Sequence, residues 1–165
     1  HVLCDEGFVE LREKAGHLLL QIGIEADLSG QALLAGLSPQ ELADLSRLGT
    51  RVVFDAGARI IDAGEPPARV YFLVRGMVSV RSAHDVRLST LIPGMAFGEL
   101  ALIDQPRIAD VWADTEAVCL EISAEQFHAF QETHARAADR IMRNLAILLA
   151  GRVRMANARI DMLTG

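Results

Sequence analysis

The chain has 165 residues, of which 51% are hydrophobic, and a formal net charge of −6 at pH 7. This composition excludes a disordered protein, and the acidic balance argues against binding to nucleic acid, which needs an excess of Lys and Arg. The only two cysteines, Cys4 and Cys119, are too few for a disulfide framework, so we expect a reduced, cytoplasmic setting.

The N-terminal part of the chain is predicted to be helical. Its apolar residues recur at spacings of three and four: Phe8, Leu11, Ala15, Leu18 and Ile22. This spacing predicts an amphipathic helix over residues 8–22, which either packs on the following domain or is the last helix of a preceding one. Turn-forming residues then predict a linker to residue 30. We therefore divide the chain into an N-terminal helix and linker, 1–30, and a main domain, 31–165.

A second helix has a clear start signal in Ser38-Pro39-Gln40-Glu41. Ser is a preferred helix cap, Pro suits the first helical position, and Glu three residues after the cap returns a hydrogen bond to it. Gly49 marks the end of this helix, after which the apolar pattern changes from helical to alternating.

Residues 50–122 contain short segments rich in Val, Ile, Phe and Leu, separated by turn signals every 8 to 12 residues. This pattern predicts an all-β sandwich or barrel. The predicted strands are 51–54, 59–61, 70–74, 77–81, 87–92, 109–113 and 117–121.

The C-terminal part of the chain is again predicted to be helical. Ser123 and Gln126 form a second capping box. A long helix is predicted from about residue 135 to 162, with Gly151 as a candidate bend. Its apolar stripe runs through Met142, Leu145, Leu149, Val153, Ala156, Ile160 and Leu163. Such a stripe is longer than one small β-domain covers, so we expect it to join two copies of the chain as a homodimer.

A possible anion site lies in the segment 97–109. Gly98 allows close approach of a ligand to the backbone, and the N–H groups of the turn that follows favour an anion. Arg107 offers a planar guanidinium that can bind two phosphate oxygens, whereas the carboxylate of Glu99 only accepts hydrogen bonds and suits a hydroxyl. The segment therefore favours a sugar phosphate, with phosphate at Arg107 and a sugar hydroxyl at Glu99.

Residues 37–130 resemble the cyclic nucleotide-binding domain family, the module of catabolite activator protein and the regulatory subunit of protein kinase A. The matching segments are "FDAGARIIDAG", "VYFLVRGMVSV", "PGMAFGELALI" and "PRIADVWA". The resemblance implies a mainly β fold with flanking helices, a jelly-roll-like β-roll (double-stranded β-helix) with N-terminal helices and a long C-terminal helix. It also implies a regulatory domain that signals through this last helix.

The resemblance further implies that the ligand is cyclic AMP, with no metal ion. The implied ligand-binding residues are seven in the segment 97–109 and two on the last helix: Gly98, Glu99, Leu100, Ala101, Arg107, Ile108, Ala109, Arg152 and Asn157. Arg152 and Asn157 would cover the base. Cyclic GMP-selective members usually carry a hydroxyl after the arginine, where this chain has Ile108. Asp110 is a second departure, which is harmless if it points outward but opposes binding or pairs with Arg107 if it points inward.

No arrangement of residues predicts catalysis, and the five histidines lack metal-binding spacing. Apolar runs of membrane-spanning length are also missing, so we expect this chain to contact neither membrane nor nucleic acid. Two alternatives to a cyclic nucleotide sensor stay open. One is a degenerate copy of the fold that serves oligomerisation or another effector, and the other is the regulatory tail of a larger protein such as a glutaminase or a transporter.

Overall fold

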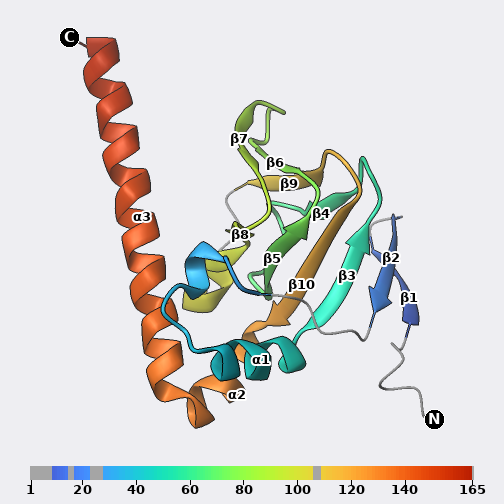
Figure 1. Cartoon of the computed structure of the whole chain (residues 1–165). Helices are drawn as coiled ribbons and strands as arrows, with labels where there is room; N and C mark the ends of the chain where they lie inside the picture. The colour runs from blue at the N-terminus through green and yellow to red at the C-terminus, as the bar shows by residue number, and fades with distance from the viewer. Residues whose placement is uncertain (1–8, 15–16, 23–27, 106–108, 165) are drawn as a thin grey trace.

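A computed structural model describes residues 9–14, 17–22, 28–105 and 109–164. Its strands are β1 (Val9–Lys14), β2 (His17–Ile22), β3 (Thr50–Phe54), β4 (Arg59–Ile61), β5 (Arg69–Arg75), β6 (Val78–Arg81), β7 (Arg87–Leu91), β8 (Ala96–Phe97), β9 (Asp110–Ala113) and β10 (Ala117–Ser123). Its helices are α1 (Pro39–Leu48), α2 (Ala124–Thr133) and α3 (Ala135–Thr164), with short 3-10 helices η2 (Ala32–Leu34) and η3 (Glu99–Ile103). Figure 1 shows the β-structure flanked by helices, with α3 extending far beyond it.

The strands form two antiparallel sheets, which confirms the predicted β-roll. The larger sheet has the order β1-β2-β3-β10-β5-β8, and the smaller has the order β4-β9-β6-β7. One core lies between the two sheets and includes Phe54, Tyr71 and Cys119. A second core lies between the larger sheet and the helices and includes Leu120 and Ile141. Because β10 faces both cores, almost its whole length is apolar and buried.

The predicted helix over residues 8–22 is wrong. Residues 9–14 and 17–22 form the antiparallel hairpin β1–β2, and β2 continues the larger sheet by pairing with β3. Short apolar runs fit helical and extended periods alike, and pairing with a sheet edge decides between them. Of the predicted linker, residues 23–27 lie outside the described part, whereas Leu28 is buried in the core beneath the helices.

The other predicted elements are confirmed within one or two residues, and β8 is an addition. Ser38 and Ser123 each cap a helix, and both capping boxes are complete. The long helix runs from Ala135 to Thr164 without interruption at Gly151. Its first half packs on η2 and α2, and there its buried residues include Ile141 and Leu145.

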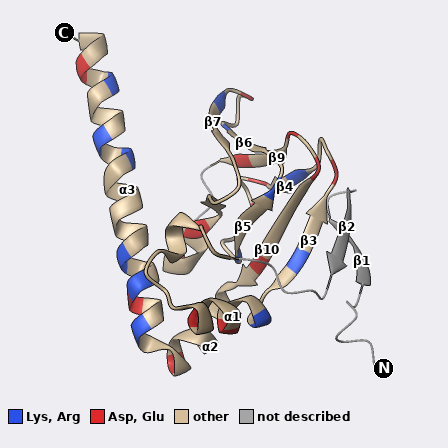
Figure 2. Ribbon diagram, viewed as in Figure 1, with Lys and Arg blue, Asp and Glu red and all other residues tan. Residues whose placement is uncertain are grey.

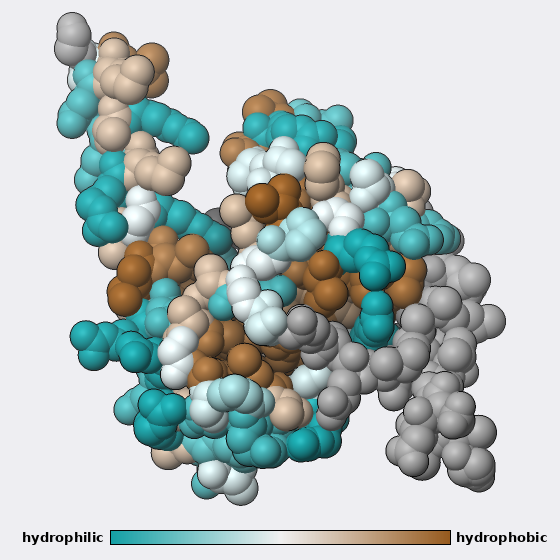
Figure 3. Space-filling view, viewed as in Figure 1, coloured by the Kyte–Doolittle hydropathy of each residue, from teal (hydrophilic) through white to brown (hydrophobic). Residues whose placement is uncertain are grey.

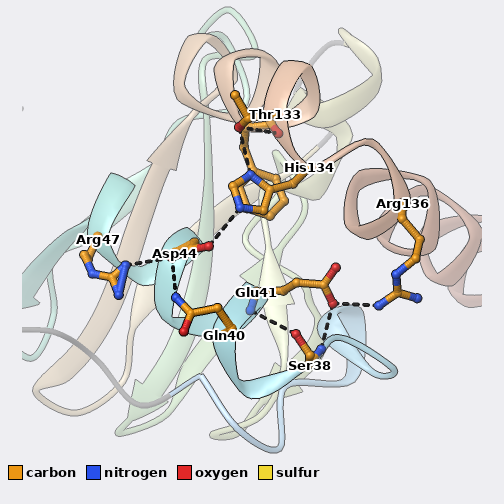
Figure 4. Close-up of polar contacts among 9 residues, drawn as sticks. Ser38, Gln40, Glu41, Asp44, Arg47, Thr133, His134 and Arg136 are labelled. Carbon is orange, nitrogen blue, oxygen red and sulfur yellow. Dashed lines mark hydrogen bonds and ion pairs between the residues drawn. The ribbon is translucent and has the colours of Figure 1, made fainter.

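Polar contacts fasten α1 to the junction of α2 and α3 (Figure 4). Asp44 Oδ2 lies 2.9 Å from His134 Nε2, and the Arg136 guanidinium donates to Glu41 Oε1 at 2.7 Å. The Ser38 backbone N–H also donates to Glu41 at 2.8 Å. We call these contacts of Glu41 and Asp44 the helix clasp.

The helix clasp is expected to weaken in acid. The Ser38 backbone hydrogen bond lowers the pKa of Glu41 below its ordinary 4.5, and the hydrogen bond with His134 lowers the pKa of Asp44 below its ordinary 3.8. A carboxylate with a lowered pKa stabilises the fold at neutral pH, and this contribution is lost as the pH falls below those ordinary values toward the folded-state pKa. The double variant Glu41→Gln/Asp44→Asn should therefore show a flatter fall of unfolding free energy in acid, measured by urea denaturation.

The matched control is Glu132→Gln, which changes an exposed carboxylate of α2. This control should keep the acid dependence of the wild type. If the unfolding free energy of the wild type and of the double variant fell equally with pH, Glu41 and Asp44 would not be the source of the acid dependence.

Candidate ligand-binding site

A cavity of about 250 Å³ opens between the smaller sheet, the β8–η3 segment and α3. Its walls are mainly apolar, as in most small-molecule sites. The lining residues are Ile61, Val80, Leu88, Ser89, Leu91, Ala96, Phe97, Gly98, Glu99, Leu100, Ala109, Val111 and Arg152. The cavity therefore brings together residues from the segment 97–109, from strands far apart in the sequence, and from the C-terminal helix.

Glu99 is a buried acid in this cavity. It opens η3 directly after Gly98, which adopts the left-handed conformation (φ 70°, ψ 14°) favoured by glycine. The Glu99 residue is only 5% exposed, and its Oε1 lies 2.6 Å from Arg152 Nη1. A buried carboxylate is costly without a partner, and the Arg152 guanidinium is the partner of Glu99 inside the cavity. This ion pair also links the cavity directly to α3.

The predicted site residues fall into three groups. Gly98, Glu99, Leu100, Ala109 and Arg152 line the cavity. Two others are described but are not lining residues of the cavity: Ala101, which is buried, and Asn157, which is exposed on α3. Arg107 and Ile108 lie outside the described residues. The structure thus brings together both ends of the segment 97–109 and Arg152, and the binding roles of all nine residues stay predictions.

Asp110 points away from the cavity. Its Oδ1 accepts a hydrogen bond of 2.7 Å from the Ala63 backbone N–H in the turn after β4. Its neighbours Ala109 and Val111 line the cavity instead, as alternation along an extended segment requires. Of the two orientations considered for Asp110, the outward one is therefore found.

Sequence reasoning missed the wall formed by β7. Leu88, Ser89 and Leu91 line the cavity, and Ser89 supplies the hydroxyl of this wall. Opposite Ser89 on β6 lies Val80, which also lines the cavity. Alternation in β6 indicated one apolar face, but no local signal shows that this face borders a cavity instead of a closed core.

The described residues offer neither a metal site nor a reactive thiol. They contain no group of three or more His, Cys, Asp or Glu residues placed to hold a metal ion. Burial, and secondarily the charge of Glu121, raises the pKa of the Cys119 thiol, which makes it a poor nucleophile. In this part of the chain no helix combines the length and the apolar character needed to cross a membrane.

Comparisons with known proteins identify relatives of this chain. The family described as "Cyclic nucleotide-binding domain" matches residues 51–134. Glutaminase 1 of Bradyrhizobium diazoefficiens is 49% identical over 138 residues, which cover 84% of this chain but 22% of that protein. The chain therefore spans about a fifth of the length of this relative.

Solved structures show the same fold. The catabolite activator protein of Thermus thermophilus superposes with a TM-score of 0.69 and 28% identity, over 81% of this chain and 63% of that one. A cyclic nucleotide-binding domain from Methylobacillus flagellatus gives a TM-score of 0.73 with 17% identity, over 86% of this chain and 87% of that one. At that identity the second match is evidence of fold alone.

Proposed function

Because this chain belongs to the cyclic nucleotide-binding domain family, we propose that it is a regulatory domain that binds cyclic AMP and signals through α3. The observation that carries the proposal is the Glu99–Arg152 ion pair. It supports the proposal because Glu99 is a buried carboxylate in the cavity, able to accept from a sugar hydroxyl, and contacts Arg152 of the C-terminal helix at 2.6 Å. The proposed binding module is residues 31–165, and the preceding strands β1 and β2 extend its larger sheet.

In the proposed complex, each chemical group of the ligand has its own partner. Arg107 binds the cyclic phosphate, and Gly98 with Leu100, Ala101, Ile108 and Ala109 shapes the backbone around it. A ribose hydroxyl donates to Glu99. Arg152 and Asn157 cover the base from α3. Leu88 and Ser89 of β7 form the wall beside the base, a contribution supported by their place in the cavity lining.

Signalling follows from the position of Glu99 between ligand and helix. The carboxylate that accepts from the ribose is the same one that holds Arg152. Ligand binding therefore changes the contact that fixes α3 beside the cavity, and the helix passes this change to a neighbouring domain or subunit. A ligand shifts such an equilibrium only through different affinity for its two states, and this shared carboxylate is a source of that difference.

The relatives favour a place for this sensor in a larger protein. Two glutaminases of Bradyrhizobium diazoefficiens are 49% and 46% identical to it, and the chain spans 22% of each. We propose that the chain is a regulatory tail of this kind, that it senses without catalysing, and that it works in the cytoplasm without binding membrane or nucleic acid. We also propose that two copies of the chain form a homodimer through the distal half of α3.

Cyclic AMP is expected to bind more tightly than cyclic GMP. The reason is Ile108, which has no hydroxyl to offer to a guanine where cyclic GMP-selective relatives usually have one. Isothermal titration calorimetry with both nucleotides measures this, and ligand-induced stabilisation gives a second readout because a tighter ligand raises the melting temperature more.

Tighter binding of cyclic GMP would contradict the stated preference. Heat signals and melting temperatures unchanged by either nucleotide would contradict the proposed function itself. That second result would instead favour a degenerate copy of the fold that serves oligomerisation or another effector.

A further inference from the structure

Strand β7 is a weakly supported wall of the cavity. It is an edge strand of the smaller sheet and pairs with β6, and the register of that pairing shifts between Val80 and Arg81. Residues 87–90 of β7 are all exposed; Leu88, which lines the cavity, is 53% exposed. An edge strand with a register shift needs additional contacts to hold one position.

Such contacts lie on the outer face of the smaller sheet. Asp114, directly after β9, receives hydrogen bonds from Arg87 Nη1 at 2.9 Å and from Ser79 Oγ at 2.9 Å. Arg81 Nη2 lies 3.5 Å from the same carboxylate. Arg87 also donates to Thr90 Oγ1 within β7. We call Ser79, Arg81, Arg87 and Asp114 the outer clamp, which connects β7 to the end of β9 across β6.

Charge makes Asp114 the central member of the outer clamp. Arg81 and Arg87 are direct cross-strand partners in the β6–β7 pair. Like charges in that arrangement repel and push two strands apart. The Asp114 carboxylate contacts both guanidinium groups and compensates this repulsion, and its side chain is only 16% exposed. Asp85 offers Arg81 a further carboxylate, but at 76% exposure that contact is strongly screened.

Asp114 is held in its charged form. Burial by itself raises its pKa, but the hydrogen bonds from Arg87 and Ser79 and the charges of Arg87 and Arg81 outweigh burial, so the net pKa is lowered. The compensating charge is therefore present at neutral pH.

The outer clamp and the cavity occupy opposite faces of the same sheet. Val80 and Ser89 line the cavity, whereas Ser79 and Arg81, the neighbours of Val80 on β6, belong to the outer clamp. Outer-clamp residues are thus absent from the described cavity lining and can act on a ligand only through the position of β7.

We propose that Asp114 and Arg87 are positioning residues that hold β7, with Leu88 and Ser89, against the base of the bound nucleotide. This inference rests on the proposed function. It assigns the outer clamp a role in recognition of the base, separate from the phosphate and ribose contacts of Arg107 and Glu99.

The test compares two ligands, cyclic AMP and ribose 3′,5′-cyclic phosphate without a base, by calorimetry on the whole chain. Asp114→Asn should weaken cyclic AMP binding about threefold to tenfold, the range expected for one net hydrogen bond, and should leave the affinity for the base-free ligand within about twofold. Arg87→Ala should have a smaller effect, because it removes the repulsion between Arg81 and Arg87 together with the hydrogen bond to Asp114. Adding Arg87→Ala to Asp114→Asn should then restore part of the loss.

The control is Arg47→Ala, which removes an arginine–aspartate bridge of 2.7 Å on α1, away from the cavity; it should bind both ligands like the wild type. Equal weakening of both ligands in Asp114→Asn would reduce the outer clamp to a general structural role and overturn the inference. Unchanged cyclic AMP affinity in both Asp114→Asn and Arg87→Ala would overturn it too. A wild type that binds neither ligand would instead remove the proposed function, and the inference with it.

Discussion

Arg107→Ala is expected to weaken cyclic AMP binding by about tenfold to a hundredfold or more, without unfolding the chain. One hydrogen bond to a charged group contributes about 1.5 to 3 kcal/mol, and a guanidinium can make two such bonds to a phosphate. Arg107 itself lies outside the described residues. The assignment is supported by its neighbours, because Glu99 and Ala109, on either side of it in the sequence, both line the cavity.

Calorimetry measures the loss of affinity, and thermal melting without ligand shows whether the fold is intact. Arg107→Lys separates charge from geometry: a lysine keeps the charge but cannot bind two oxygens in one plane, so it should recover only part of the affinity. Arg154→Ala on α3, where Arg154 is exposed, serves as the matched control. Equal affinities for wild type and Arg107→Ala would exclude Arg107 as the phosphate ligand.

Glutamate at both Val153 and Ile160 is expected to convert a homodimer into a monomer. Both side chains belong to the distal half of α3 and are exposed, by 60% and 55%. In Figure 3 this part of the helix stands clear of the rest of the molecule. Together with Ala156 and Leu163 they continue the apolar stripe at spacings of three and four, the pattern of two helices packed along one seam. Glutamate side chains in such a seam would be buried without a partner when two helices associate, and this cost opposes the dimer.

Molar mass from light scattering is the measurement. Met155→Glu is the matched control, because Met155 is 61% exposed on the same helix but lies off the stripe; this variant should stay dimeric.

Six arginines and two aspartates lie within α3, and Figure 2 shows basic residues at intervals along it. Two such helices repel, so added salt should strengthen the wild-type dimer. A monomeric wild type, or a double variant that remains dimeric, would exclude this stripe as the contact.

Local signals in the sequence account for most of the elements. The two serine caps, the end of α1 at Gly49 and the β-strand alternation between residues 50 and 122 each depend on residues a few positions apart. Short-range interactions of this kind are largely independent of the rest of the fold. Recognition of the family likewise depended on glycines and apolar residues in fixed order along the chain.

The N-terminal hairpin shows where local signals fail. Residues 9–22 carry an apolar pattern compatible with a helix, but β2 pairs with β1 and also with the edge of β3, which lies outside the segment. The helix prediction counted periodicity within the segment and had no access to this neighbour.

The sequence by itself determined helices α1, α2 and α3 and most of the β-strands between residues 50 and 122, because caps, turns and apolar alternation act over a few residues. Only the tertiary structure decided that Glu99 pairs with Arg152, 53 positions further along, that Asp110 points outward, and that Ser89 borders the cavity. Each of these depends on which faces of distant elements meet. The packing of two sheets and a long helix around their cores sets which faces come into contact. No short stretch of sequence contains this information.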